Sequence, residues 1–123
     1  MSDRASITIL VVDDEESMLK LAAAILQRDG YQVVTAQNGL AAMTALDENP
    51  DITLLFTDIK MPGIDGFILA DMAKVRRPDL KVLYATGFAD EVGTKPGVRH
   101  GKILEKPYDP PQLRAEVRRL LNT

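Results

Sequence analysis

Short apolar runs rich in β-branched residues alternate with amphipathic stretches along the chain. Such runs suit strands that are covered on both faces, because a strand with one wet face would alternate polar and apolar residues. We expect strands at residues 7–12, 31–36, 52–57, 81–86 and 102–104. The alternation predicts an α/β fold, a doubly wound five-stranded parallel sheet with helices on both faces. For five strands, the order 2-1-3-4-5 is favoured.

Between the strands, apolar residues recur three and four positions apart, which is the spacing of one helix face. We expect helices over residues 15–29 and after Asn38-Gly39, Met61-Pro62-Gly63 and Asp109-Pro110-Pro111. The residues expected to face the sheet are Met18, Leu21, Ala22 and Ile25 in the first helix, Ala42, Met43 and Leu46 in the second, Ile64, Phe67, Ile68, Met72 and Val75 in the third, and Leu113, Val117, Leu120 and Leu121 in the last.

One stretch interrupts the pattern between the fourth and fifth strands, where a crossover helix is due. It contains Gly87, Gly93, Pro96, Gly97 and Gly101. Glycine and proline both disfavour a regular helix. We therefore expect a short or irregular fourth helix.

Length and composition exclude several classes of function. The 123 residues suit one domain, residues 1–123, and no apolar run approaches the length of a membrane span. The first residues lack the apolar core of a signal peptide, so we expect a cytoplasmic protein with no membrane partner. A net charge of −3 without a basic stripe argues against nucleic-acid binding by this chain. With no cysteine and a single histidine, any metal must be held by oxygen ligands.

Polar residues follow the predicted strands at their carboxyl ends, where open α/β sheets bind ligands. Asp13-Asp14 follow the first strand, Asp58 the third, Thr86 ends the fourth and Lys106 follows the fifth. The sequence therefore predicts that three carboxylates, a hydroxyl and an ammonium group meet at one edge of the sheet.

Each of these residues has a simpler interpretation when taken alone. Asp13 or Asp14 could cap the following helix, and Asp58 could be a turn residue. Thr86 is an ordinary strand residue, and a lysine such as Lys106 is usually a solvated charge. A separate structural role for each residue would not explain why they all lie at neighbouring strand ends, so a single shared site is the preferred interpretation.

The electrostatics of such a cluster favour a cation. Two like charges about 4 Å apart repel by about 4 kcal/mol at an effective dielectric constant of about 20. A few carboxylates completed by water and a phosphoryl oxygen are typical ligands of Mg²⁺. Lys106 and Thr86 could then hold a phosphoryl group on Asp58, since carboxylates serve as nucleophiles in aspartyl-phosphate formation.

Four segments carry these residues in a fixed order along the chain. They are Leu10-Val11-Val12-Asp13-Asp14-Glu15, Asp58-Ile59-Lys60-Met61-Pro62-Gly63-Ile64-Asp65-Gly66, Ala85-Thr86-Gly87 and Glu105-Lys106-Pro107. Together they resemble the signature segments of the receiver domains of two-component response regulators. The resemblance covers essentially the whole chain and implies a flavodoxin-like fold.

The resemblance implies a role for each residue. Asp58 would accept a phosphoryl group from a histidine kinase or a phosphotransfer protein. Asp14, Asp58 and the backbone carbonyl of Lys60 would bind Mg²⁺, with Asp13 close by, often through water. Thr86 and Lys106 would hold the phosphoryl oxygens. The domain would promote only its own phosphorylation and dephosphorylation and would otherwise not be an enzyme.

Two features depart from the common receiver pattern. The switch position three residues before Lys106, often tyrosine or phenylalanine, is Ile103. The segment Tyr84-Ala85-Thr86-Gly87-Phe88 is similar to a single-domain subgroup with a Phe-Ala-Thr-Gly-aromatic pattern. We hypothesise that phosphorylation orders residues 87–101 instead of turning an aromatic ring.

Three other interpretations remain at the level of sequence. A small phosphatase or phosphotransferase could also use an aspartate nucleophile on a similar sheet, although Lys60 stands where its acid/base carboxylate commonly lies. A degenerate receiver would act as a binding module only. The chain could also be a receiver from a hybrid kinase, and its output partner is not identified by sequence.

Overall fold

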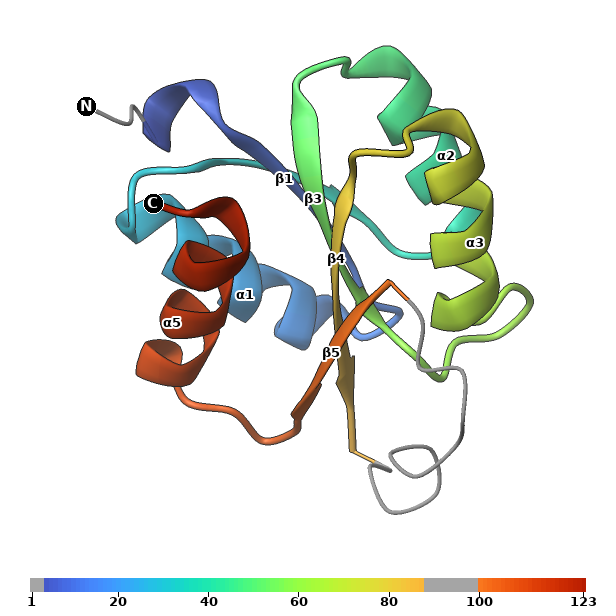
Figure 1. Cartoon of the computed structure of the whole chain (residues 1–123). Coiled ribbons are helices and arrows are strands. Elements are labelled where there is room, and N and C mark those ends of the chain that lie inside the picture. Colours follow the sequence, from blue (N-terminus) through green and yellow to red (C-terminus); the bar gives the residue numbers. More distant parts are fainter. Residues whose placement is uncertain (1–3, 88–99) are drawn as a thin grey trace.

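The computed structural model describes residues 4–87 and 100–123, and these form a parallel sheet between two layers of helices (Figure 1). The strands are β1 (Thr8–Val12), β2 (Gln32–Ala36), β3 (Ile52–Asp58), β4 (Lys81–Thr86) and β5 (Gly101–Glu105). Their order is β2-β1-β3-β4-β5, and every neighbouring pair is parallel. The predicted α/β class, strand number and strand order are confirmed.

Within the part of the chain that the structure describes, helices cover both faces of the sheet (Figure 1). The α-helices of the described ranges are α1 (Glu16–Arg28), α2 (Gly39–Glu48), α3 (Gly66–Arg76) and α5 (Pro110–Leu121), and a 3-10 helix, η1 (Arg4–Ser6), precedes β1. None of the helices in these ranges is long and apolar enough to cross a membrane. The predicted irregular fourth helix, and most of the segment 87–101, fall outside the described residues.

Alternate residues of each strand enter different cores. In β1, Ile9 and Val11 pack with α1 and α5, whereas Leu10 and Val12 pack with α2 and α3. All four are nearly inaccessible to solvent. Burial on both faces explains why the strands read as continuous apolar runs in the sequence.

The face that α3 turns to the sheet differs from the prediction. Ile68 is 49% exposed and Val75 is 82% exposed. The buried residues of the helix are instead Gly66, Leu69, Ala70 and Ala73. A Cβ atom on Gly66 would lie 2.3 Å from the carbonyl oxygen of Asp58, so small residues let α3 approach β3 closely. In α1, Leu21 is likewise 47% exposed, whereas Ala22 and Ile25 are buried as predicted.

Side chains cap the starts of three helices. Asp109 and Gln112 form a reciprocal capping box at α5. Asn38 accepts a hydrogen bond from the Ala41 N–H at α2, and Asp65 accepts one from the Ile68 N–H at α3. These bonds satisfy backbone donors that have no partner inside the helix and fix where each helix begins.

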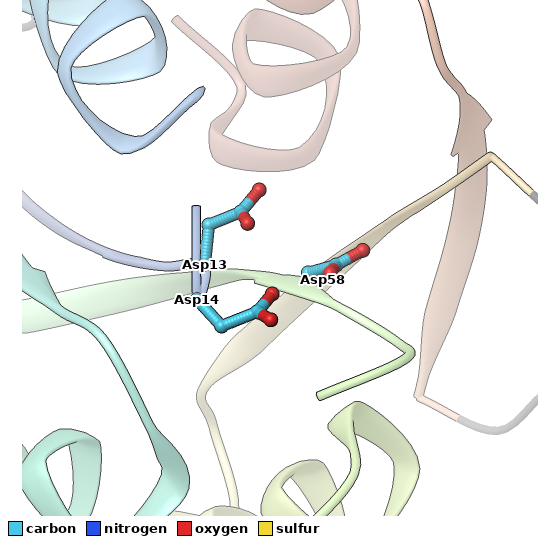
Figure 2. A group of neighbouring side chains, drawn as sticks. All are labelled: Asp13, Asp14 and Asp58. Atoms are coloured by element: carbon cyan, nitrogen blue, oxygen red, sulfur yellow. The ribbon is translucent and has the colours of Figure 1, made fainter. Parts of the chain in front are cut away.

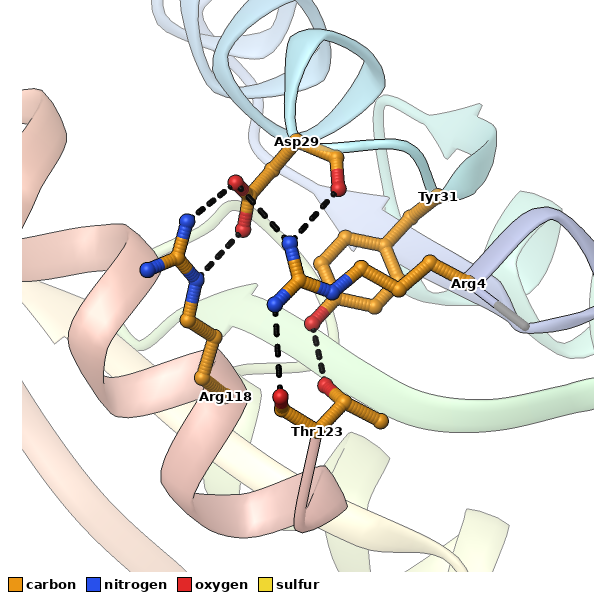
Figure 3. A network of polar contacts seen from close by, with 5 residues as sticks. All are labelled: Arg4, Asp29, Tyr31, Arg118 and Thr123. Carbon is orange, nitrogen blue, oxygen red and sulfur yellow. Dashed lines mark hydrogen bonds and ion pairs between the residues drawn. The ribbon is translucent and has the colours of Figure 1, made fainter. Parts of the chain in front are cut away.

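A polar network joins η1, the end of α1 and the end of α5, at the amino ends of the strands (Figure 3). We call it the Asp29 network; its members are Arg4, Asp29, Tyr31, Arg118 and Thr123. Arg118 Nε donates to Asp29 Oδ2 at 2.9 Å, and Arg4 Nη1 lies 3.3 Å from Asp29 Oδ1. Tyr31 and Thr123 share a hydroxyl hydrogen bond of 2.6 Å. The network ties three segments together that are far apart in the sequence.

Candidate functional site

Three carboxylates gather where β1 and β3 end. Val12 pairs with Thr57 across the sheet, so the next residues, Asp13 and Asp58, reach the same level. One carboxylate oxygen from each of Asp13, Asp14 and Asp58 lies within 4.8 Å of the others. Figure 2 shows the three side chains drawn together at this edge. The convergence of carboxylates predicted from the strand ends is therefore present.

The two neighbouring aspartates have different surroundings. Asp13 is buried, with 5% exposure, whereas Asp14 is exposed. Asp13 Oδ1 accepts a hydrogen bond of 3.0 Å from the N–H of Glu15. Glu15 is the N-cap residue of α1 and has no capping bond from its side chain. Asp13 therefore belongs to the cluster rather than to the first turn of the helix.

Lys106 brings a positive charge into the cluster from the end of β5. Its Nζ lies 3.0 Å from Asp13 Oδ2 and 3.3 Å from Asp58 Oδ1. The Lys106 side chain is 14% exposed, and its backbone N–H donates to the Thr86 carbonyl at 2.8 Å. One ammonium group thus faces a cluster of three carboxylates.

The pKa of Asp58 reflects this imbalance. Burial raises it from 3.8 to about 6, Lys106 opposes the rise, and the charges of Asp13 and Asp14 add to it. For Lys106, burial lowers the pKa, but the hydrogen bond to Asp13 and the charges of Asp13 and Asp58 outweigh burial and raise it overall. Asp58 is therefore poorly stabilised as an anion by the protein alone, while Lys106 stays charged.

Thr86 and Lys60 flank the cluster along the chain. Thr86 ends β4 and is fully buried; it follows Ala85, the residue that pairs with Asp58. Lys60 lies two residues after Asp58 and is exposed. Contact of the Thr86 hydroxyl with a phosphoryl group, and ligation by the Lys60 carbonyl, stay predictions.

Two contributors to the site were not found in the sequence. Gly66 lets α3 approach the carbonyl of Asp58, although a glycine after a turn carried no obvious signal of close contact. Tyr108 is 8% exposed and packs against Phe56; burial raises its pKa, and the nearby charges of Asp13 and Asp58 add to the rise. An aromatic residue two positions after Lys106, amid polar residues, was the available signal.

The donor set fits a hard divalent cation. Mg²⁺ binds oxygen ligands at about 2.1 Å, so opposite ligands of one ion lie about 4.2 Å apart. The oxygens of Asp13, Asp14 and Asp58 lie within 4.8 Å, which requires little contraction. A divalent charge would also offset the repulsion that raises the pKa of Asp58.

The sequence matches the family model of the response regulator receiver domain over residues 9–118. The response regulator receiver protein CpdR from Brucella abortus is 38% identical over 116 residues, which cover 92% of this chain and 95% of that protein. Sensor kinase CckA from the same organism is 29% identical over 119 residues, 94% of this chain but 13% of that protein. The chain also spans about half the length of other curated relatives.

A solved structure with a similar fold is the response regulator TrrA from Thermotoga maritima, in complex with Mg(2+)-BeF. It has a TM-score of 0.83 and 29% sequence identity, and the likeness covers 93% of this chain and 98% of that one. The fold, the carboxylate cluster at the strand ends and the family match over residues 9–118 agree. The chain belongs to the response regulator receiver domain family.

Proposed function

We propose that this receiver accepts a phosphoryl group on Asp58 and thereby controls a partner protein or passes the group onward. The observation that carries the proposal is the position of the Asp58 carboxylate. It ends a central strand, lies within 4.8 Å of two other carboxylates and has Lys106 Nζ at 3.3 Å. An oxygen nucleophile on Asp58 would thus lie near both a cation site and an ammonium group.

The carboxylates of Asp13, Asp14 and Asp58, with the carbonyl of Lys60, would hold Mg²⁺. Bound there, Mg²⁺ would supply positive charge against the carboxylates and the incoming phosphoryl oxygens. The same likeness to TrrA, which was solved with Mg(2+)-BeF, supports this assignment. Lys106 and the Thr86 hydroxyl would orient the phosphoryl oxygens.

The phosphoryl donor would be a histidine kinase or a phosphotransfer protein. An Asp58 oxygen attacks phosphorus, a P–O bond forms, and the P–N bond to the donor histidine breaks, with the electron pair leaving on the imidazole nitrogen. Hydrolysis of the aspartyl phosphate by water returns the free carboxylate and phosphate. In this reading the chain consumes one phosphoryl group per cycle and is a signalling module rather than an enzyme with a separate substrate.

Several parts of the assignment extend beyond the family match. We take residues 1–123 as one receiver domain in the cytoplasm, and Ile103, half-buried beside Tyr84 in the sheet, as a departure from aromatic switching. The likeness to CckA, over a small part of that kinase, keeps a hybrid-kinase origin open.

The experiment is phosphorylation by a small donor, acetyl phosphate, with and without Mg²⁺, followed by intact mass measurement. We expect a mass increase of one phosphoryl group that requires Mg²⁺ and disappears in Asp58→Asn. Asp51→Asn, which changes an exposed aspartate elsewhere, should keep the increase. Phosphorylation of Asp58→Asn at the wild-type level would show that the acceptor is wrong. Rapid turnover of many donor molecules would favour the phosphatase alternative.

A further inference from the structure

Tyr108 lies between the candidate site and the core formed by α1, α5 and the sheet. It is 8% exposed and belongs to the same core as Val11, Phe56 and Leu113. Its ring meets the ring of Phe56 edge to face, with centroids 5.8 Å apart and planes at 65°. Such a pair restrains both rings beyond simple burial.

Each ring of this pair is two residues away from a member of the site. Phe56 precedes Asp58 by two positions in β3, and Tyr108 follows Lys106 by two positions. Successive strand residues point to opposite faces, so Phe56 and Asp58 lie on the same side of β3. The contact between Tyr108 and Phe56 therefore links the segment that carries Lys106 to the strand that carries Asp58.

The connection from Lys106 to α5 is fixed at both ends. The Lys106 N–H donates to the Thr86 carbonyl at 2.8 Å. Asp109 accepts from the Gln112 N–H at 2.9 Å, and its own N–H donates to Gln112 Oε1 at 2.8 Å. Between these anchors, Tyr108 is the residue whose side chain enters the core.

The hydroxyl of Tyr108 lies within electrostatic range of the acidic cluster. Burial raises its pKa to about 12, and the charges of Asp13 and Asp58 add to the rise. The phenol is therefore neutral at ordinary pH. Tyr108 thus adds no negative charge near the cluster.

We propose that Tyr108 is a positioning residue whose ring, packed against Phe56, holds the Lys106 ammonium group between Asp13 and Asp58. The proposal rests on the proposed function, because that position is where the ammonium group would meet a phosphoryl oxygen on Asp58. A lysine side chain has a flexible four-carbon stem, so its charge is directed only as well as its backbone is held. The hydroxyl of Tyr108 is not required.

The test compares two affinities in purified full-length variants. Mg²⁺ binding is measured by calorimetry, and binding of beryllofluoride, a phosphoryl mimic, is measured at saturating Mg²⁺. Tyr108→Leu removes the ring, and Tyr108→Phe removes the hydroxyl alone. Tyr31→Leu is the matched control, because Tyr31 is 3% exposed in the same core but belongs to the Asp29 network. Thermal unfolding is recorded for all, with Tyr108→Met as the substitute if the leucine variant does not fold.

We expect Tyr108→Leu to weaken beryllofluoride binding by about tenfold or more, since small displacements of an orienting charge have large effects. Its Mg²⁺ affinity should be unchanged or higher, because a loosened ammonium group competes less for Asp13 and Asp58. Tyr108→Phe should stay within about twofold of wild type for both ligands. Tyr31→Leu should lose stability with both affinities intact.

Three results would overturn the proposal. Tyr108→Leu could bind beryllofluoride like wild type; Tyr108→Phe could lose as much as Tyr108→Leu, which would assign the effect to the hydroxyl; or Tyr108→Leu could lose Mg²⁺ affinity. If wild type itself fails to bind beryllofluoride, the proposed function fails instead. The Mg²⁺ measurements then still test whether Tyr108 holds Lys106: a higher Mg²⁺ affinity in Tyr108→Leu would support that role, and a lower one would contradict it.

Discussion

Asp58 and Asp29 lie at opposite ends of the parallel strands, and their pKa values move in opposite directions. Their side chains are 9% and 8% exposed. The pKa of Asp58 rises to about 6, chiefly through burial. That of Asp29 falls, chiefly through its hydrogen bond to Arg118, although burial opposes the fall.

Both burial and partners contribute to the difference, because Asp58 is buried as a whole residue whereas Asp29 is half-buried and has more cationic neighbours. Asp29 has two guanidinium groups, from Arg4 and Arg118, around one carboxylate (Figure 3). Asp58 shares one ammonium group with Asp13 and also faces Asp14 (Figure 2). The Asp29 network is electrostatically complete and serves stability, whereas the cluster around Asp58 is incomplete without a cation.

The largest expected difference between the Asp58 cluster and the Asp29 network is their effect on stabilisation of the fold by Mg²⁺. At an Mg²⁺ concentration 100 times its dissociation constant, the free energy of unfolding should rise by about 2.7 kcal/mol. Asp14→Asn should reduce this gain, whereas Asp29→Asn should keep it, because Asp29 is remote from the cluster. Urea unfolding with and without Mg²⁺ measures both. If Asp14→Asn gained as much unfolding free energy from Mg²⁺ as wild type, Asp14 would not be a ligand of the ion.

The same substitution should have opposite effects at the two edges without Mg²⁺. Asp29→Asn should lower the free energy of unfolding by about 1–2 kcal/mol, because it removes a carboxylate bound by two cations. Asp58→Asn should raise it by about 1–2 kcal/mol at pH 7, because it relieves a charge that the fold destabilises. Urea unfolding of both variants at low salt is the measurement. Equal destabilisation by both would contradict the comparison.

The pH dependence of Mg²⁺ binding should follow Asp58. Its carboxylate must lose a proton to bind the ion, and its pKa is about 6. Affinity should therefore rise about tenfold from pH 5 to pH 7 and level off above pH 7. Calorimetric titrations at several pH values test this. A curve already flat above pH 5 would show that Asp58 titrates normally.

The slopes of stability against pH in the metal-free protein should also differ between the two aspartates. The raised pKa of Asp58 gives stability that is present below pH 3.8 and is lost as the pH rises through about 6. The lowered pKa of Asp29 gives stability that is present above 3.8 and is lost as the pH falls below it. Asp58→Asn should remove the fall in stability between pH 3.8 and about 6, and Asp29→Asn should remove the fall in stability below pH 3.8. Urea unfolding of wild type and both variants from pH 3 to pH 8 measures this. The prediction is wrong if either variant keeps the pH dependence assigned to its aspartate.

The fold was largely predictable because its signals are local. Continuous apolar runs indicated buried parallel strands, and the strand ends indicated where Asp13 and Asp58 would meet. The orientation of α3 was wrong, because Ile68 and Val75 are exposed while small residues such as Gly66 contact the sheet. A helix with apolar residues on most sides does not reveal which stripe faces inward, and the close approach to Asp58 decided it.

By itself the sequence determined the layer architecture and the residue types at the strand ends and favoured the strand order, because the periodicity of apolar residues is set by neighbours in the chain. Only the tertiary structure decided how those groups pair. The 3.0 Å contact of Lys106 with Asp13, the contact of Tyr108 with Phe56 and the Asp29 network join residues far apart in the sequence. Those long-range partners determine whether an aspartate stabilises the fold or forms a cation site, and a local sequence pattern does not reveal them.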